Sequence, residues 1–309
     1  MTATDREELL GLARQRLVAA GVWDPDGDLV ALAERFLGPA DPAAALAEFE
    51  VAVQERCARI PLGHITGDVA FDRLRLAVGS GVFVPRAESL AVVDWATGAG
   101  VVPEGGLVLD LCSGVGALGL AIARRRPDLR VVCVERADTA VRYLRRNVAR
   151  YAVSTGPVRV HVADLCQPGC LDEYRDVDLI TANPPYVQPS IKLLPEWADH
   201  QPKDAIYAGA DGLDLIRVIA AHALRSLRPG GWLAVEHDRR QPEPVRQVLA
   251  AAGFTDLSTA NDSAGEPRIT TARASARAGA SAGVEPRVDA RADTGVTARA
   301  DARAAERTS

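Results

Sequence analysis

The stretch LVLDLCSGVGALGLAIARRRPDLRVVCVE, residues 107–135, decides the fold of this chain. It opens with a short apolar run that ends at Leu111, passes through a glycine-containing turn, and continues as an apolar helical segment. A second apolar run then ends at Glu135. Strand, turn, helix and strand in this order are typical of a parallel βαβ unit, and the near-continuous apolar runs indicate strands that are buried on both faces.

The same alternation continues after residue 135. Further strands are predicted at 158–162, 177–182 and 232–236, with a turn at Pro229-Gly230-Gly231 before the last, and weaker ones near 254–259 and 268–271. Helices are predicted at 138–150, 213–227 and 245–252. We therefore predict an α/β protein whose central sheet is mostly parallel and is covered by helices on both faces.

The residues before this region have other periodicities. Residues 4 to about 60 have helical spacing, with helix-start signals at Thr4–Glu7 and at Asp41-Pro42. Phe71 to Val78 alternates between apolar and polar residues, so a β-hairpin with its turn at 79–81 and its return strand at 82–84 is predicted. A helix from Leu90 to about Thr97 follows.

The chain is therefore divided into four parts. Residues 1–62 are expected to form a helical domain, 63–84 a β-hairpin linker and 85–272 an α/β domain. Residues 273–309 repeat Ala, Arg, Asp, Gly, Ser and Thr without an aromatic residue or an apolar stripe, so this part is expected to be a disordered tail.

Composition restricts the class of function. The net charge of the 309 residues is -5, which supplies no overall positive field for nucleic acid or for a membrane surface. The five cysteines are scattered and no His/Cys cluster has zinc spacing, so no metal is expected. Neither an apolar leader nor a membrane-length apolar run is found. We expect a soluble, cytoplasmic monomer.

Polar residues and glycines stand at the ends of three successive strands. Asp110 and the turn Cys112-Ser113-Gly114-Val115-Gly116 follow the first strand, Glu135 ends the second, and Asp164 follows the third. Glycines let a ligand approach the backbone, and an acidic residue about 20 positions after such a turn can bind ribose hydroxyls. Each residue alone is equally compatible with a strand-end cap, but together they favour a cofactor that contains adenosine.

The identity of this cofactor follows from the turn. It lacks the third glycine of a NAD fingerprint and the Gly-Lys of a phosphate-binding loop. S-adenosylmethionine fits better, because its ammonium group can meet Asp110 and its carboxylate can meet the amides of the glycine turn.

Asn183-Pro184-Pro185-Tyr186 closes the strand at 177–182. The Asn183 side-chain oxygen and the Pro184 carbonyl are two acceptors beside the aromatic face of Tyr186, which suits a planar NH2 group. A proline-rich turn with a surface tyrosine is an equally simple interpretation of these four residues in isolation. In combination with a methyl-donor site, they predict methylation of an amide or of a base amine.

Together these motifs resemble the class I methyltransferases that modify planar nitrogens, and among them the HemK/PrmC family of protein-(glutamine-N5) methyltransferases. The further motifs that carry this resemblance are Pro85-Arg86-x-Glu88, Ala208 to Leu213, Pro229-Gly230-Gly231, Glu236 with Gln241, and Ala264-Gly265-x-x-Arg268. It covers residues 55 to 273 and implies a Rossmann-like fold and S-adenosylmethionine as methyl donor. It also implies that residues 1–62 are a substrate-recognition domain and residues 85–272 the methyltransferase catalytic domain. The implied substrate is the glutamine of the Gly-Gly-Gln loop in peptide chain release factors.

The resemblance also assigns the candidate site. Asn183, Pro184 and Tyr186 are expected to be catalytic, and these three together with Pro185 and Arg86 to bind substrate. The expected cofactor-binding residues are Asp110, Cys112, Ser113, Gly114, Gly116, Glu135, Asp164 and Asn183. From spacing alone, an ion pair between Arg86 and Glu88 is the favoured interpretation of that segment.

The chain departs from the family pattern at three positions. Cys112 replaces the first glycine of the cofactor turn, where its side chain is expected to crowd the methionyl end of the cofactor. Leu90 stands where the family has Glu, and Gln201-Pro202 replaces Glu-Pro. Two alternatives stay open at this point: a nucleic-acid methyltransferase acting on adenine N6 or cytosine N4 of a flipped base, and a non-catalytic relative that only binds the cofactor.

Overall fold

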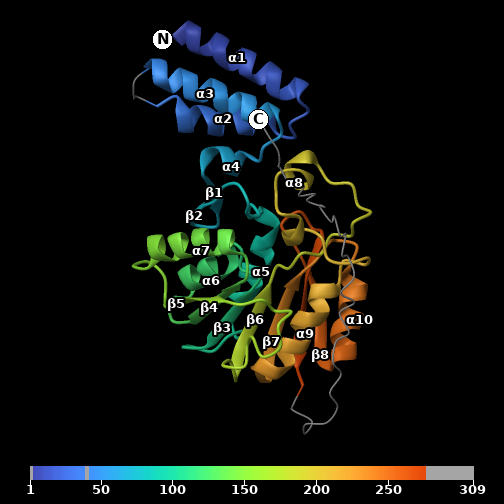
Figure 1. Cartoon of the computed structure of the whole chain (residues 1–309). Coiled ribbons are helices and arrows are strands. Elements are labelled where there is room, and N and C mark those ends of the chain that lie inside the picture. Colours follow the sequence, from blue (N-terminus) through green and yellow to red (C-terminus); the bar gives the residue numbers. More distant parts are fainter. Residues whose placement is uncertain (1–2, 39–41, 276–309) are drawn as a thin grey trace, which may run out of the picture. The chain divides into compact units, whose positions relative to one another are not determined.

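The computed structural model describes residues 3–38 and 42–275, which lie within one compact unit. Its centre is a seven-stranded sheet with the strand order β5-β4-β3-β6-β7-β9-β8 (Figure 1). The strands are β3 (Leu107–Leu111), β4 (Arg130–Glu135), β5 (Val158–Val162), β6 (Val177–Ala182), β7 (Leu227–Glu236), β8 (Phe254–Asn261) and β9 (Pro267–Ala274). The neighbours from β5 to β7 pair in parallel, whereas β9 is antiparallel to both β7 and β8. The predicted mostly parallel, Rossmann-like α/β fold is confirmed.

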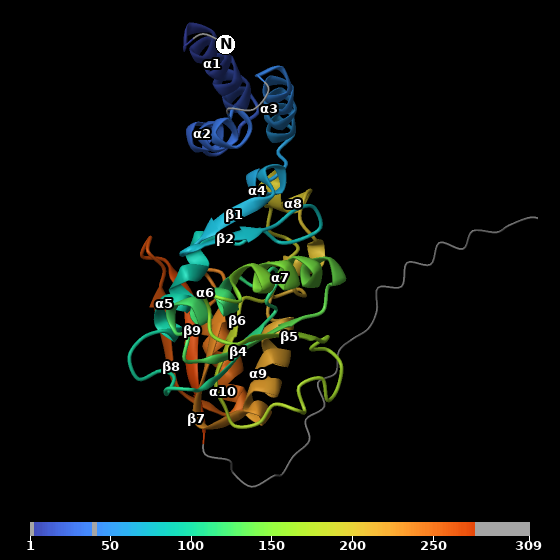
Figure 2. The same cartoon turned by 90° about the vertical axis from the view of Figure 1, so that its left-hand side faces the viewer.

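Helices cover both faces of this sheet. One face carries α5 (Leu90–Ala96), α6 (Ala117–Arg125) and α7 (Asp138–Tyr151), and the other carries α9 (Asp214–Ser226) and α10 (Pro242–Ala252) (Figure 1; Figure 2). Successive strand residues point to opposite faces, so Val108 joins the core under the first set and Leu109 the core under the second. Both residues are fully buried, which explains why apolar side chains occupy both faces of this strand.

Three short elements lie in the loops: η1 (Ala87–Ser89), α8 (Pro195–Ala198) and η2 (Lys203–Ala205). The first precedes α5, and the other two lie between β6 and α9. None of the three was predicted as a separate element. Each is one turn or less in length, and so short a segment has too few positions to show a helical period.

The N-terminal segment is helical, as predicted. It contains α1 (Ala3–Ala19), α2 (Pro25–Phe36) and α3 (Pro42–Cys57), which share a small apolar core that includes Leu32 and Phe49. Asp24 begins α2, where its carboxylate accepts a hydrogen bond from the Gly27 backbone N-H at 3.0 Å. The predicted capping groups of Thr4 and Asp41 lie outside what the structure describes.

The predicted β-hairpin is displaced along the chain. After α4 (Leu62–Thr66), which was not predicted, the two strands are β1 (Asp68–Phe71) and β2 (Leu74–Ala77), so the turn lies at Asp72 and Arg73. Asp72 has φ +52°, a left-handed conformation that aspartate tolerates better than most residues. The alternating residues 71–78 therefore include the turn and the second strand, and the prediction of a single strand there was wrong.

Residues 82–84 do not form the predicted return strand. The backbone N-H of Val84 donates instead to the Gln201 side-chain oxygen at 3.0 Å. The loop that carries Gln201 therefore takes the place of a sheet partner at this point.

Two strand boundaries also differ from the prediction. The Pro229-Gly230-Gly231 segment lies within β7, which begins at Leu227, and the pairing of β6 with β7 shifts register beside it. Gly230 has φ +74°, so the prediction of a turn found a real local irregularity but mistook it for the end of an element. The last strand, β9, runs to Ala274 and so passes the boundary of 272 that was predicted for the catalytic domain. The remainder of the predicted tail, residues 276–309, lies outside the described part of the chain.

Candidate active site

The carboxyl ends of four parallel strands meet at one edge of the sheet. Between β3 and β6 the chain changes direction across the sheet, because β4 and β5 extend from β3 on one side and β6 and β7 lie on the other. In open α/β sheets ligands bind in the crevice at such a switch point. The predicted residues after β3, β4 and β6 therefore share this edge with Glu236, which ends β7.

The turn after β3 contains three residues in left-handed conformations. Cys112 has φ +57°, Gly114 φ +56° and Gly116 φ +95°. The Ser113 hydroxyl donates to the Asp110 carbonyl at 2.6 Å, and the Gly116 N-H donates to the Ser113 carbonyl at 2.8 Å. A side chain on Gly116 would place Cβ only 2.6 Å from Leu144, whereas a Cβ on Gly114 would meet nothing within 4 Å. The backbone is thus accessible to a ligand at Gly114.

Asp110 is completely buried beside this turn. One carboxylate oxygen accepts from the Thr181 hydroxyl at 3.0 Å and the other from the Gly119 N-H at 3.1 Å. Burial raises the pKa of this carboxyl to about 7, although these hydrogen bonds oppose the rise. Asp110 therefore links β3 to β6 and to α6, and its predicted contact with a ligand ammonium group stays a prediction.

Glu135 joins the ends of β3 and β4. One of its carboxylate oxygens accepts from the Gly114 N-H at 2.8 Å, and the other accepts from the N-H groups of Arg136 and Ala137, both at 2.8 Å. A carboxylate has about four lone-pair sites, so Glu135 can accept further hydrogen bonds. Together with the accessible Gly114 backbone, it fits the ribose of an adenosine-containing cofactor.

Asp164 follows β5 at the same edge. Its carboxylate accepts from the Cys166 N-H at 2.9 Å and so stabilises its own loop. The structure brings Glu135 against the glycine turn through a direct hydrogen bond, whereas the Asp164 carboxylate makes no hydrogen bond to the turn within the described residues. Its predicted role with an adenine amino group stays a prediction.

The loop Asn183-Pro184-Pro185-Tyr186 follows β6. The Asn183 amide nitrogen donates to the Ser89 hydroxyl at 3.0 Å, and within the described residues no donor contacts its amide oxygen. The Tyr186 hydroxyl donates to Glu236 at 3.2 Å, and the Gln241 amide donates to the Tyr186 carbonyl at 3.1 Å. The loop is thus stabilised by three side chains: Ser89 in η1, Glu236 at the end of β7, and Gln241 directly before α10.

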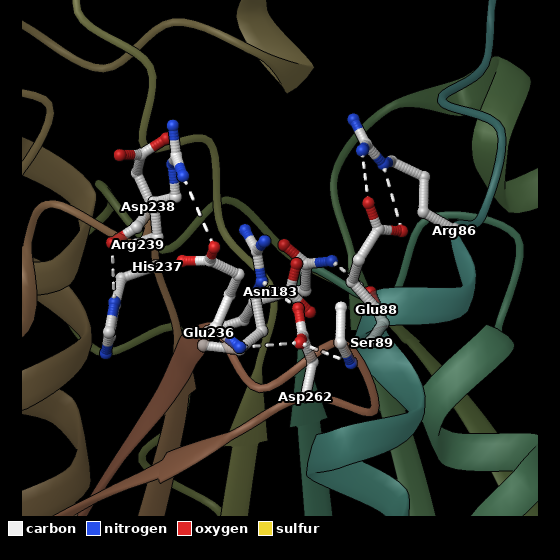
Figure 3. A network of polar contacts seen from close by, with 12 residues as sticks. Arg86, Glu88, Ser89, Asn183, Glu236, His237, Asp238, Arg239 and Asp262 are labelled. Carbon is white, nitrogen blue, oxygen red and sulfur yellow. Dashed lines mark hydrogen bonds and ion pairs between the residues drawn. The ribbon is translucent and has the colours of Figure 1, made fainter.

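Glu236 lies at the centre of this network. It is 2% exposed, and burial raises its pKa to about 7 against the opposing effects of the nearby Ser89 hydroxyl and the Arg268 guanidinium. Arg268, at the start of β9, donates to Asp262 at 3.2 Å. Figure 3 shows Glu236 beside Asn183, with Ser89 next to Asn183 and Asp262 below them.

Arg86 lies directly before η1, three positions before Ser89. It pairs with Glu88 through two hydrogen bonds (Figure 3). Its guanidinium carbon stands 4.1 Å from the centre of the Trp197 ring. The predicted ion pair is confirmed. The function of Arg86 in substrate binding stays a prediction.

Sequence reasoning missed two side chains of the site. Ser89 and Trp197 contact Asn183 and Arg86 respectively, but Ser89 is separated from Asn183 by 94 positions. No local pattern marks a serine as the partner of so distant a residue. The only available signal was the position of Ser89 directly after the Arg86–Glu88 segment.

Comparison with known sequences places this chain among methyltransferases. The model of the family "Methyltransferase small domain" matches residues 70–194. The chain is 42% identical over 272 residues to a release factor glutamine methyltransferase of Mycolicibacterium smegmatis, covering 84% of this chain and 94% of that protein. It is 39% identical to the Streptomyces coelicolor protein of the same name, covering 84% and 95%.

Among solved structures, a methyltransferase from Pyrococcus furiosus matches with a TM-score of 0.49 and 16% sequence identity. The match covers 73% of this chain and 98% of that one.

Proposed function

This chain belongs to the release factor glutamine methyltransferase family, and we propose that it methylates the N5 nitrogen of a glutamine side chain in a peptide chain release factor. The methyl donor in this proposal is S-adenosylmethionine, and the target is the glutamine of the Gly-Gly-Gln loop. The acceptor site on this chain is the Asn183–Tyr186 loop.

The observation that carries this proposal is the orientation of the Asn183 amide. One N-H of its nitrogen donates to Ser89 at 3.0 Å, and its oxygen, which no donor contacts within the described residues, is the acceptor available to a ligand. An oxygen acceptor at this position selects a ligand that donates, and a primary amide nitrogen donates two hydrogen bonds. The Pro184 carbonyl supplies the second acceptor of the pair.

In this proposal the residues of the Asn183–Tyr186 loop position the substrate amide. An amide nitrogen is a poor nucleophile because its lone pair is delocalised into the carbonyl group. Two acceptors that hold both N-H groups favour the geometry in which this lone pair is released, and Tyr186, fixed by Glu236 and Gln241, limits the movement of the amide. Bound S-adenosylmethionine supplies an electrophilic methyl group at a sulfonium centre.

The cofactor half of the site fits this donor. Glu135 has acceptor capacity for a ribose hydroxyl, and the backbone at Gly114 is accessible to a ligand. The N-H groups of Ser113, Gly114 and Gly116 already donate within the protein, so they shape the turn. We assign Asp110, Cys112, Asp164 and Asn183 to the same cofactor surface.

We further propose that residues 1–62 recognise the protein substrate, with 63–84 as the linker and 85–272 as the catalytic domain. Support comes from a buried ion cluster that connects the helical segment to the loop after Asn183. Arg56 and Arg59 donate to Glu196 at 2.8 Å and 2.6 Å, and all three side chains are at most 16% exposed. The helical segment is thereby tied to the loop that carries Trp197.

Transfer of radiolabelled methyl from S-adenosylmethionine tests the proposed function. The purified chain is incubated with a class I release factor, with a variant of that factor in which the Gln of Gly-Gly-Gln is Ala, and with DNA. We expect label on the first acceptor alone. Label on the Gln→Ala variant would refute the assigned glutamine, and label on DNA would refute a protein substrate.

A further inference from the structure

The Glu236 carboxylate has one oxygen that no group of the described chain uses. Its Oε1 accepts from the Tyr186 hydroxyl at 3.2 Å, whereas Oε2 is buried without a hydrogen-bond partner among the described residues. The residue is 2% exposed and lies at the end of β7, on the site edge. Buried carboxylate oxygens are nearly always satisfied, so an unused one at an active site needs a physical explanation.

Ser89 supplies the complementary group. Its hydroxyl oxygen accepts from the Asn183 amide nitrogen at 3.0 Å, so its own proton is free to turn to another acceptor. Ser89 is 3% exposed, and hydrogen bonding by its hydroxyl lowers the pKa of the Glu236 carboxyl. A hydroxyl donor and a carboxylate acceptor thus lie next to each other, beside Asn183 (Figure 3).

We propose that Glu236 is the positioning residue for Asn183, acting through the Ser89 hydroxyl. An ionised carboxylate can only accept hydrogen bonds, so it directs the Ser89 proton toward itself. The lone pairs of Ser89 then face Asn183 and can be satisfied only by its NH2 group. This fixes the Asn183 oxygen toward the acceptor substrate, and the inference rests on the proposed function for that last step alone.

The same arrangement gives the network two states. A protonated Glu236 can donate to Ser89, which can then donate to Asn183 and favour the reversed amide, with NH2 toward the substrate. The charged groups that face Glu236 are Arg268 from β9 and Arg86 from the segment before η1, and Tyr186 faces it from the loop after β6. Arg268 is shared with Asp262 and Arg86 with Glu88, so neither guanidinium is a dedicated partner of Glu236.

A substrate-free measurement tests the orientation. The side-chain NH2 signal of Asn183 is identified in an amide ¹H–¹⁵N spectrum by its loss in Asn183→Ala, and it is then followed from pH 5 to pH 9. We expect its shifts to titrate with a midpoint near 7, because burial raises the pKa of Glu236 to about 7. The titration should disappear in Glu236→Gln and remain in Glu243→Gln, a control at an exposed glutamate on α10. Persistence of the titration in Glu236→Gln would overturn the proposal.

The kinetic test uses the same variants with release factor as substrate. Misorientation of an amide by one reversed hydrogen bond should lower kcat by about 100-fold in Glu236→Gln, with the dissociation constant of S-adenosylmethionine unchanged. Ser89→Ala should show a similar loss and Ser89→Thr, which keeps the hydroxyl, should recover most of kcat. The double variant Ser89→Ala/Glu236→Gln should be no worse than the poorer single variant, whereas multiplied losses would show that Glu236 does not act through Ser89.

The two tests separate this inference from the proposed function. If the wild-type chain methylates no release factor but the Asn183 signal titrates through Glu236, the substrate assignment fails and the positioning network stands. If release factor is methylated and Glu236→Gln keeps both full kcat and the titration, only the positioning function is refuted.

Discussion

The turn after β3 and the loop after β6 lie at the same sheet edge but are stabilised by different kinds of contact. The turn is stabilised by residues that are near it in sequence: Ser113 contacts Asp110, three positions away, and Gly114 contacts Glu135, 21 positions away. The loop is stabilised by residues that are 94 and 50 positions away, Ser89 and Glu236. The glycine turn is thus largely a local structure, with Asp110 beside it linked to Thr181, 71 positions away, whereas the acceptor half depends on the completed fold.

If the two halves are separable, Asn183→Ala should cause the largest change in activity. It removes one of two acceptors for the substrate amide, so kcat should fall by about 1000-fold, as for other lost transition-state hydrogen bonds. Titration calorimetry should show a nearly unchanged affinity for S-adenosylmethionine, because Asn183 only borders the cofactor surface, whereas Glu135 binds the ribose. An equal loss of cofactor affinity would mean that the halves are one unit.

The acceptor half should also carry a pH-dependent cost in stability. The pKa of Glu236 is raised from 4.5 to about 7, so its ionisation destabilises the folded state progressively as pH rises from 4.5 to 7, and fully above 7. Glu236→Gln has no such charge. The free energy of unfolding of this variant, relative to wild type, should therefore rise by about 3 kcal/mol between pH 4.5 and pH 8.

Urea unfolding at the two pH values measures this difference. Glu243→Gln, an exposed change of the same kind, is the control and should show no comparable dependence on pH. A constant difference between Glu236→Gln and wild type would show that the Glu236 carboxylate is not destabilised by burial.

Glu135→Gln should act on the cofactor half alone. The variant loses the charge that strengthens hydrogen bonds from ribose hydroxyls and from the Gly114 N-H, so affinity for S-adenosylmethionine should fall about 30-fold, within the usual range for a charged hydrogen bond. With saturating cofactor, kcat should stay near the wild-type value. A large loss of kcat at saturation would indicate that the turn also shapes the acceptor half.

The smallest effect is expected for Cys112→Gly. Cys112 occupies φ +57°, which is strained for a residue with a side chain, but glycine adds conformational freedom to the unfolded chain. These effects oppose each other, so the free energy of unfolding should change by less than about 1 kcal/mol. Cofactor affinity should rise if the side chain crowds the methionyl end. A loss of affinity would show that the Cys112 side chain helps to bind the cofactor.

This contrast also explains what could be predicted from the sequence. The strands around Asp110 and Glu135 were predicted because apolar runs and glycines are local signals. The left-handed conformation of Asp72 was not recognised, and the hairpin was displaced as a result. The partnership of Ser89 with Asn183 arises only when the sheet brings distant strand ends together, so no spacing rule contains it.

The position of β9 has a consequence for the order in which the protein assembles during synthesis. β9 lies between β7 and β8 in the sheet but is made after both of them. As the chain leaves the ribosome, β3 to β7 can pair in parallel with the segments already made, whereas β8 has no partner strand until β9 arrives. Arg268, at the start of β9, is therefore among the last groups to reach Glu236. The nascent chain can form its cofactor turn well before the acceptor half is closed.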